Sequence, residues 1–153
     1  MNDIQFMRRA LILAQRAQAL DEVPVGALLV KDERIIGEGF NSVRRFNDPT
    51  AHAECQAIRN ASLLERNYRL PGTTLYVTIE PCVMCIGCMI HARIQRLVFG
   101  AREPKSGAVV SKLAVLDLPH WNHRITVKAG VLEKACAELI HNFFARRRTE
   151  STD

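Results

Sequence analysis

A chain of 153 residues, 48% of them hydrophobic, is long and apolar enough for one core, and we expect residues 1–153 to form a single domain. The formal net charge of +5 and the isoelectric point near 9.2 are mildly basic, which does not by itself identify a nucleic-acid partner. Charged residues interrupt the apolar N-terminal segment and no apolar run is long enough to cross a bilayer, so the sequence predicts a cytoplasmic protein without a signal peptide or a membrane span.

Hydrophobic periodicity predicts helices alternating with strands. From the N-terminus we expect a helix over residues 3–20, a β-hairpin of strands 23–30 and 34–40, and a helix that begins near Pro49 or Thr50 with Asp48 as its cap. There follow a strand over 73–79, a helix from Pro81 to about Ala92, a strand over 96–101, a short helix within 109–116, a strand over 124–130 and a closing helix. This order predicts an α/β fold, a three-layer α/β/α sandwich around a five-stranded mixed sheet.

Three of the five cysteines, Cys82, Cys85 and Cys88, follow one another at three-residue spacing. In a reducing compartment this spacing favours metal binding or catalysis over a disulfide framework. Cys55 and Cys136 stand alone in helical patterns, and we interpret them as small buried hydrophobic residues.

The pair Cys82 and Cys85 begins a predicted helix directly after a strand, so its thiolates lie on one turn near exposed backbone N–H groups. A C-x-x-C pair alone also occurs in redox motifs and in structural zinc sites. Together with His52 at the start of another helix it becomes much more specific. Three protein ligands that leave one position for water are typical of catalytic zinc, so we expect one zinc ion per chain on these residues.

Glu54 lies two residues beyond His52, which in a regular helix would place the two side chains about 200° apart. We therefore expect His52 at the irregular start of the helix, where both side chains can face one site. A carboxylate beside the metal that does not bind it can take a proton from water and deliver protons to a leaving amine, which makes Glu54 the candidate catalytic residue. The alternative interpretation places His52 as a helix cap and Glu54 on a solvated face.

The segments HAE at 52–54 and PCVMC at 81–85 resemble the signature of zinc-dependent deaminases. The flanking segments VPVGALLV, IGEGFN, DPTAHAE, RLVFGAREPKSGA and WNHR resemble the bacterial tRNA-specific adenosine deaminases, and the resemblance extends over nearly the whole chain. It implies a cytidine deaminase-like fold and a homodimer. It also implies hydrolytic deamination of adenosine to inosine at the wobble position of a tRNA anticodon loop, where zinc lowers the pKa of the water that attacks C6 and Glu54 moves the protons.

The same resemblance implies substrate-binding residues in four parts of the chain: Asn41, Arg102, Glu103, Lys105, Asn122, Phe144 and Arg147. Asn41 is the first choice for the target base, because the family's asparagine in the matching IGEGFN segment contacts this base, and an amide offers both a donor and an acceptor. Lys105 is expected to meet phosphate, and Glu103 stands where the family usually has aspartate. On residue type alone, either asparagine could be a turn residue, Phe144 a core residue and Arg147 part of a solvated helix end.

Cys88 departs from the family pattern, which often has a small residue at this position. Three evenly spaced cysteines suggest an iron–sulfur cluster, but a fourth thiolate at suitable spacing is missing. We therefore interpret Cys88 as a core residue one helical turn beyond Cys85.

Two other functions use the same residues. A deaminase of free bases or nucleosides, of guanine or cytosine type, would share the zinc core but would not need an arginine-rich outer groove. A non-catalytic, zinc-stabilised RNA-binding module would have no use for a carboxylate beside the metal, so Glu54 argues against it.

Overall fold

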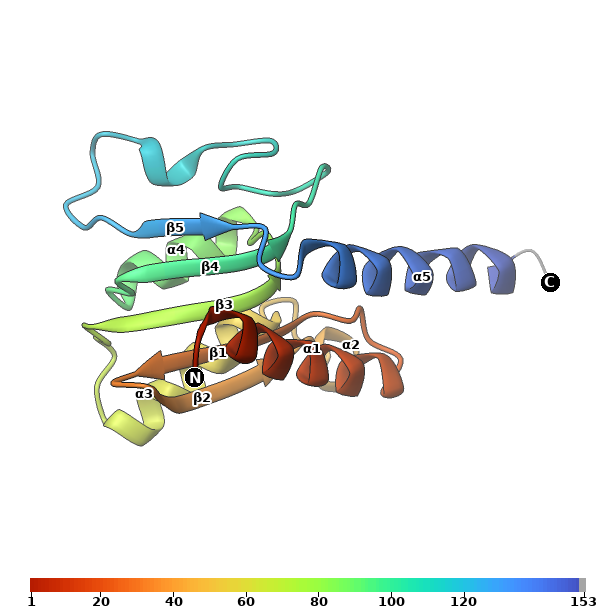
Figure 1. Ribbon diagram of the computed structural model, residues 1–153, viewed down its shortest axis with the longest axis horizontal. Helices are drawn as coiled ribbons and strands as arrows, with labels where there is room; N and C mark the ends of the chain where they lie inside the picture. The colour runs from red at the N-terminus through yellow and green to blue at the C-terminus, as the bar shows by residue number, and fades with distance from the viewer. Residues whose placement is uncertain (152–153) are drawn as a thin grey trace.

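The computed structural model describes residues 1–151, so the last two residues of the predicted domain lie outside the described residues. Its sheet has five strands in the order β2-β1-β3-β4-β5 (Figure 1). β1 pairs antiparallel with β2 and β3, whereas β3, β4 and β5 run parallel, so the predicted mixed sheet is confirmed. The strands are β1 Gly26–Lys31, β2 Arg34–Phe40, β3 Thr73–Ile79, β4 Arg96–Ala101 and β5 Thr126–Ala129.

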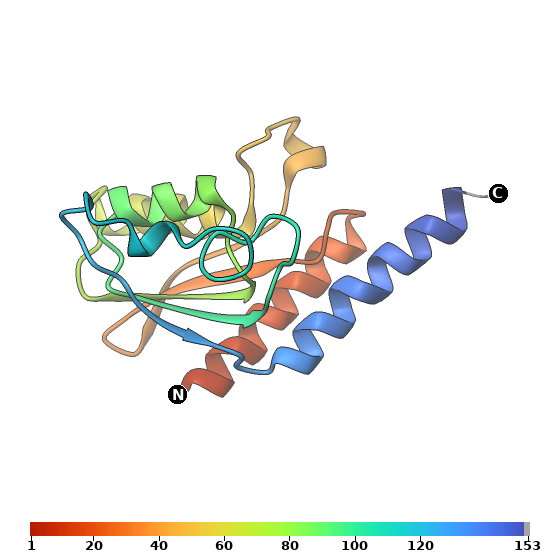
Figure 2. The ribbon, with the colours of Figure 1, turned by 90° about the horizontal axis from the view of Figure 1, so that it is seen from above.

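The helices lie on both faces of the sheet, which gives the predicted three layers. They are α1 Asp3–Ala19, α2 Val43–Phe46, α3 Ala53–Glu65, α4 Val83–His91 and α5 Glu133–Ser151, with a 3-10 turn η1 at Val115–Asp117. Figure 2 shows α3 and α4 on one side of the sheet and α1 and α5 on the other. No helix within residues 1–151 has the length and apolarity needed to cross a membrane.

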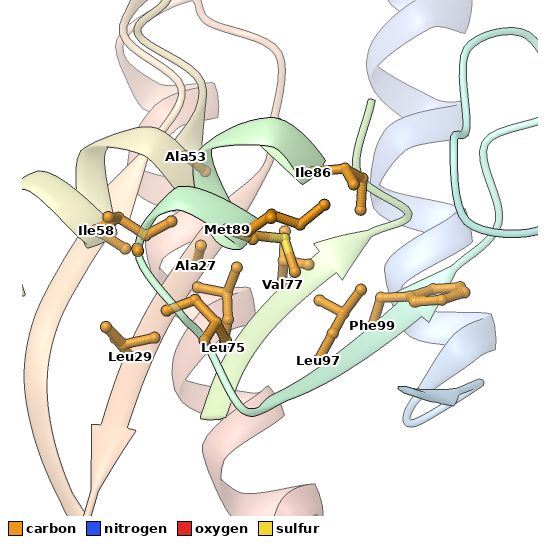
Figure 3. Packing of buried hydrophobic residues seen from close by; sticks show 14 of the residues in the cluster. Ala27, Leu29, Ala53, Ile58, Leu75, Val77, Ile86, Met89, Leu97 and Phe99 are labelled. Atoms are coloured by element: carbon orange, nitrogen blue, oxygen red, sulfur yellow. The ribbon is translucent and has the colours of Figure 1, made fainter. Parts of the chain in front are cut away.

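Alternating strand residues divide the core into two parts, as the pleat of a strand requires. Leu75, Val77, Leu97 and Phe99 point towards α3 and α4 and pack there against Met89 (Figure 3). Residues between them in β3 and β4 belong to a second cluster beneath α1 and α5. Both faces of the central strands are therefore buried, which fixes β3 and β4 relative to the helices that pack on them.

Two glycines of β2 bring α3 into direct contact with the sheet. A Cβ atom at Gly39 would lie 2.5 Å from the carbonyl oxygen of Ala53 and from the backbone nitrogen of Ala57. A Cβ atom at Gly37 would collide with the backbone of Ala57 and Ala61, one turn further along the helix. The start of α3 is thus held at a distance from β2 that only glycine allows.

Asp3 ties the start of α1 to the sheet. Its carboxylate accepts hydrogen bonds from Arg96 at 2.7 and 2.9 Å, from the Tyr76 hydroxyl at 2.6 Å and from Lys128 at 3.1 Å. The hydrogen bonds from Arg96 are the main reason that the pKa of Asp3 is well below its ordinary value.

The chain between β2 and α3 differs from the prediction. Asp48 does not cap a helix: its Oδ1 accepts hydrogen bonds from the backbone N–H of Thr50 at 2.8 Å and from the Thr50 hydroxyl at 2.7 Å, which closes a turn. The helix therefore begins at Ala53 instead of Pro49 or Thr50, and the unpredicted short helix α2 precedes it. The short helix expected within 109–116 is a 3-10 turn at its far end.

Candidate active site

Two helices begin at the same place above the sheet. His52 is the N-cap residue of α3 and Cys82 is the N-cap residue of α4, both with extended backbone dihedrals, and neither side chain caps its helix. The expectation that His52 lies at the irregular start of a helix is confirmed, and its interpretation as a side-chain cap is wrong. Because the positive ends of both helix dipoles meet here, the site favours negative charge on a side chain such as Cys82.

His52, Cys82 and Cys85 form a compact group of potential metal ligands. Their ligand atoms all lie within 4.8 Å of one another, and His52 Nδ1 is 3.6 Å from both the Cys82 and the Cys85 sulfur. Tetrahedral zinc with bonds of about 2.3 Å to sulfur and about 2.0–2.1 Å to nitrogen separates such atoms by about 3.6 Å. The donor set and its spacing therefore fit zinc.

Of these three ligands, Cys82 has a pKa shift that favours metal binding, whereas the pKa of His52 and that of Cys85 are raised. Hydrogen bonding with Cys85 and with His52 lowers the pKa of Cys82 to about 4, although burial alone would raise it. The hydrogen bond with Cys82 in turn raises the pKa of His52. A thiolate is thus available at neutral pH, and a metal cation can replace the proton that these groups share.

Glu54 faces the same site from the first turn of α3 and does not lie on a solvated face. Its side chain is only 3% exposed, and burial is the main reason that its pKa rises to about 7. It lines a pocket of about 120 Å³ together with His52, Cys82 and Asn41. A carboxylate with a pKa near neutrality can both accept and release a proton there.

The amide of Asn41 has a fixed orientation. Its Oδ1 accepts a hydrogen bond of 2.8 Å from the backbone N–H of Ala53, so this oxygen caps α3 in place of His52. The NH2 group is left as the donor that Asn41 can offer to a ligand in the pocket.

A larger cavity of about 1220 Å³ adjoins this pocket, and Glu103 and Phe144 line both. It lies between the loop after β4, with Arg102 and Lys105, and the outer half of α5, with Arg147. Phe144 is 42% exposed, so its interpretation as a core residue is wrong; the neighbouring Phe143 is the buried one. The predicted substrate-binding residues other than Asn122 thus line either the pocket of Glu54 or the larger cavity beside it.

Arg147 and Asn122 have protein partners. Arg147 donates hydrogen bonds to Asp21, at 2.7 Å to the carboxylate and at 3.0 Å to the backbone oxygen. Asn122 is exposed, accepts a hydrogen bond of 3.3 Å from Arg93, and lines neither of the two cavities. The structure therefore does not bring Asn122 to Glu54 within one chain.

The interpretation of Cys55 as a small buried residue is confirmed, but in the folded chain this residue lies beside other cysteines. Cys55 is buried, but its sulfur lies 3.8 Å from that of Cys85 and it also interacts with Cys88. Cys88 is half-buried and packs against the core, so its interpretation as a core residue is confirmed only in part. The sulfur of Cys55 on α3 thus lies beside those of Cys85 and Cys88 on α4. The three-residue spacing of the cysteines within α4 does not predict this contact with α3.

Glu80 is a site residue that sequence reasoning missed. It follows β3, is 2% exposed, and lines the Glu54 pocket. Its carboxylate accepts hydrogen bonds from the loop that contains Arg102 and Lys105. The available signal was its place immediately before Pro81 and Cys82, at the end of a buried strand.

The comparisons with known proteins agree with this geometry. A family model for the zinc-binding region of cytidine and deoxycytidylate deaminases matches residues 1–101. Together with the mixed five-stranded sheet and the His/Cys/Cys group, this match defines the class of the chain as a zinc-binding deaminase.

Particular relatives narrow the class. The tRNA-specific adenosine deaminase of Haemophilus influenzae is 51% identical over 97% of this chain and 86% of its own length. That of Agrobacterium fabrum is 45% identical over 95% of both chains. A structure from biochemical and structural studies of A-to-I editing by tRNA:A34 deaminases is 46% identical, with a TM-score of 0.86 over 88% of this chain and 98% of the other. The guanine deaminase of Nitrosomonas europaea has a TM-score of 0.77 at 26% identity, over 93% and 84%. The chain belongs to the family of the tRNA-specific adenosine deaminases.

Proposed function

We propose that this chain is a hydrolase that converts adenosine to inosine at the wobble position of a tRNA anticodon loop. The observation that carries the proposal is the buried Glu54 beside the His/Cys/Cys group, in a pocket that opens onto a cavity lined by cationic side chains. The tRNA-specific relatives support this substrate, and the single-stranded anticodon loop suits it because a base there is extruded at little cost.

The proposal assigns one zinc ion per chain to His52, Cys82 and Cys85. Their separations support this assignment, as does the lowered pKa of Cys82. Zinc, when bound, would act as a Lewis acid and lower the pKa of a bound water to near neutrality.

Glu54 is the proposed proton carrier. In the net reaction, water oxygen bonds to C6 of adenine, the bond from C6 to the exocyclic nitrogen breaks, and ammonia leaves, so adenosine and water give inosine and ammonia. The Glu54 carboxylate accepts a proton from the water and delivers protons to the leaving amine. Its burial and its pKa of about 7 support both halves of this task.

The proposed RNA contacts surround the pocket. Asn41 donates from its NH2 group to an acceptor on the base, and its fixed orientation supports this direction of hydrogen bonding. Arg102, Glu103 and Lys105 on one wall, and Phe144 and Arg147 on the other, are proposed to hold the anticodon stem-loop. Asn122 is proposed as a further contact outside this pocket.

The homodimer, the single domain over residues 1–153 and the location in the cytoplasm are proposed on the family resemblance. Exposed apolar side chains at the end of α3 and just beyond it, Leu63, Leu64 and Tyr68, support a protein contact on that side of the chain. Analytical ultracentrifugation tests the dimer directly.

The deciding experiment measures inosine formation in a short RNA hairpin that has adenosine at the wobble position. Wild type is compared with Glu54→Ala, and free adenosine, guanine and cytidine serve as parallel substrates. We expect deamination of the hairpin alone and its loss in the variant, with zinc content unchanged because Glu54 is not a ligand. The expected loss is at least 10²–10⁴-fold, the usual contribution of a general acid–base residue.

The other outcomes separate the alternatives. Activity on a free base or nucleoside only would leave the zinc chemistry intact and refute the tRNA substrate; the likeness to the guanine deaminase makes guanine the first comparison. A chain that binds zinc and RNA but deaminates nothing would instead be a binding module.

A further inference from the structure

The carboxylate of Glu80 holds both ends of one loop. Its Oε1 accepts a hydrogen bond of 3.1 Å from the backbone N–H of Glu103 and another from the Ser111 hydroxyl. Its Oε2 accepts hydrogen bonds of 3.0, 2.9 and 3.0 Å from the backbone N–H groups of Val109, Val110 and Ser111. A single buried side chain thus satisfies four backbone donors that lie up to eight residues apart.

The backbone of this loop packs tightly against the Glu80 carboxylate. A Cβ atom at Gly107 would lie 2.5 Å from both carboxylate oxygens of Glu80, so only glycine lets the chain pass so close. The next amide, that of Ala108, donates a hydrogen bond of 2.9 Å to the backbone oxygen of Pro81. The segment between the two attachment points contains Lys105 and Ser106, which line the large cavity.

Glu80 also lies close to the proposed metal ligands and to Glu54. It is two residues from Cys82 along the chain and lines the same pocket as Glu54. The position of the loop is therefore fixed by its hydrogen bonds to Glu80, which lies at the end of β3 just before the metal ligand Cys82.

We propose that Glu80 is the positioning residue for substrate recognition: it sets the distance between the RNA-contacting loop, residues 102–106, and the pocket of Glu54. This inference rests on the proposed function, and it adds to that function a residue whose role is to hold the loop, through which it acts on substrate binding. Glu22 provides a matched comparison, since it is likewise buried and accepts backbone N–H hydrogen bonds, from Arg44 at 3.1 Å and Arg45 at 2.7 Å, on a different segment.

The variant Glu80→Gln tests the inference sharply. An amide has one oxygen, which can keep the three N–H groups that Oε2 accepts, while its NH2 group then faces the Ser111 hydroxyl and the N–H of Glu103. The hydroxyl can turn to accept a hydrogen bond, but the N–H of Glu103 cannot. Glu80→Gln should therefore release the Glu103 end of the loop and leave residues 109–111 attached, whereas Glu80→Ala should release both ends.

Hydrogen exchange measures this release without any need for activity. We expect the amide of Glu103 to exchange faster in Glu80→Gln while the amides of residues 109–111 stay protected, and all four to exchange faster in Glu80→Ala. Unchanged exchange at Glu103 in Glu80→Gln would overturn the inference even if the hairpin is deaminated. A wild-type protein that is inactive on the hairpin would refute the proposed function and leave the exchange result standing.

Kinetics on the RNA hairpin distinguish positioning from a general structural role. In Glu80→Gln we expect KM to rise about tenfold, the equivalent of one lost hydrogen bond, with a smaller change in kcat and unchanged zinc content. Lys105→Ala should raise KM in the wild type but have a smaller effect in Glu80→Gln, because the loop is already displaced. The same cycle with Glu22→Gln should be additive. Additive effects for Glu80→Gln and Lys105→Ala would show that Glu80 does not act through the loop.

Discussion

The contact of α3 with β2 makes Gly39→Ala a test of how the site is held. The added Cβ atom would lie 2.5 Å from the Ala53 oxygen, and ordinary contact begins at 3.4 Å, so strand and helix start must separate by about 0.9 Å. The helix start carries His52 and Glu54. Overpacking of this kind costs about 1–3 kcal/mol of unfolding free energy, and a misplacement of about 1 Å at a catalytic group can cost about 10²-fold in rate.

Gly37→Ala is the matched control, because its Cβ atom would collide with α3 one turn further from His52. We expect similar losses of thermal stability in both variants, but a loss of hairpin deamination and weaker zinc binding mainly in Gly39→Ala. Thermal unfolding, deamination rates and competition with a chelator measure the three quantities. Equal losses of activity in the two variants, or full activity in Gly39→Ala, would refute the idea that the glycine contact sets the position of the site.

Three further outcomes are expected. Removal of zinc by a chelator should lower the unfolding temperature, since a ligand at about 1,000 times its dissociation constant contributes about 4 kcal/mol; calorimetry that shows no change contradicts this. Asn41→Asp keeps the oxygen that caps Ala53 but loses the NH2 donor, so it should fold as stably as the wild type yet deaminate the hairpin about 10–100-fold more slowly, whereas Asn41→Ala should also lose about 1 kcal/mol of stability. Asp3→Asn should lower the unfolding free energy by about 1.5–3 kcal/mol at pH 7. Because the pKa of Asp3 is lowered, its stabilisation is present above the unfolded-state pKa of about 3.9 and is lost as pH falls towards the folded-state pKa, so urea unfolding should show this difference shrinking below pH 4.

Local patterns predicted the regular elements well. The strands at 73–79 and 96–101 match β3 and β4, because both are short apolar runs and the first is bounded by Pro71-Gly72 and Glu80-Pro81. Residue types predict a helix start at Pro49 or Thr50, because Pro49 and Asp48 suit a helix N-terminus, whereas Asp48 closes a turn with Thr50 and the helix begins later, at Ala53.

The candidate site was predictable only in part, for a related physical reason. The spacing of His52, Glu54, Cys82 and Cys85 contains most of the chemistry, and the structure brings these four side chains together. The role of Glu80 could not be predicted from the sequence, because it depends on backbone N–H groups of a loop more than twenty residues away. Every residue except proline has such an N–H group, so the amino-acid types do not indicate which ones bind Glu80.

The two helix starts that meet at the site have a consequence for how the protein acquires its metal. His52 and Cys82 are 30 residues apart, with β3 between them, so no short fragment of the chain holds the complete ligand set. A newly made chain can therefore bind zinc in this arrangement only after β3 has joined the sheet and α4 has followed it. Metal content then reports on tertiary structure as a whole, and substitutions that loosen α3 from α4, even far from the ligands, should first become visible as loss of zinc.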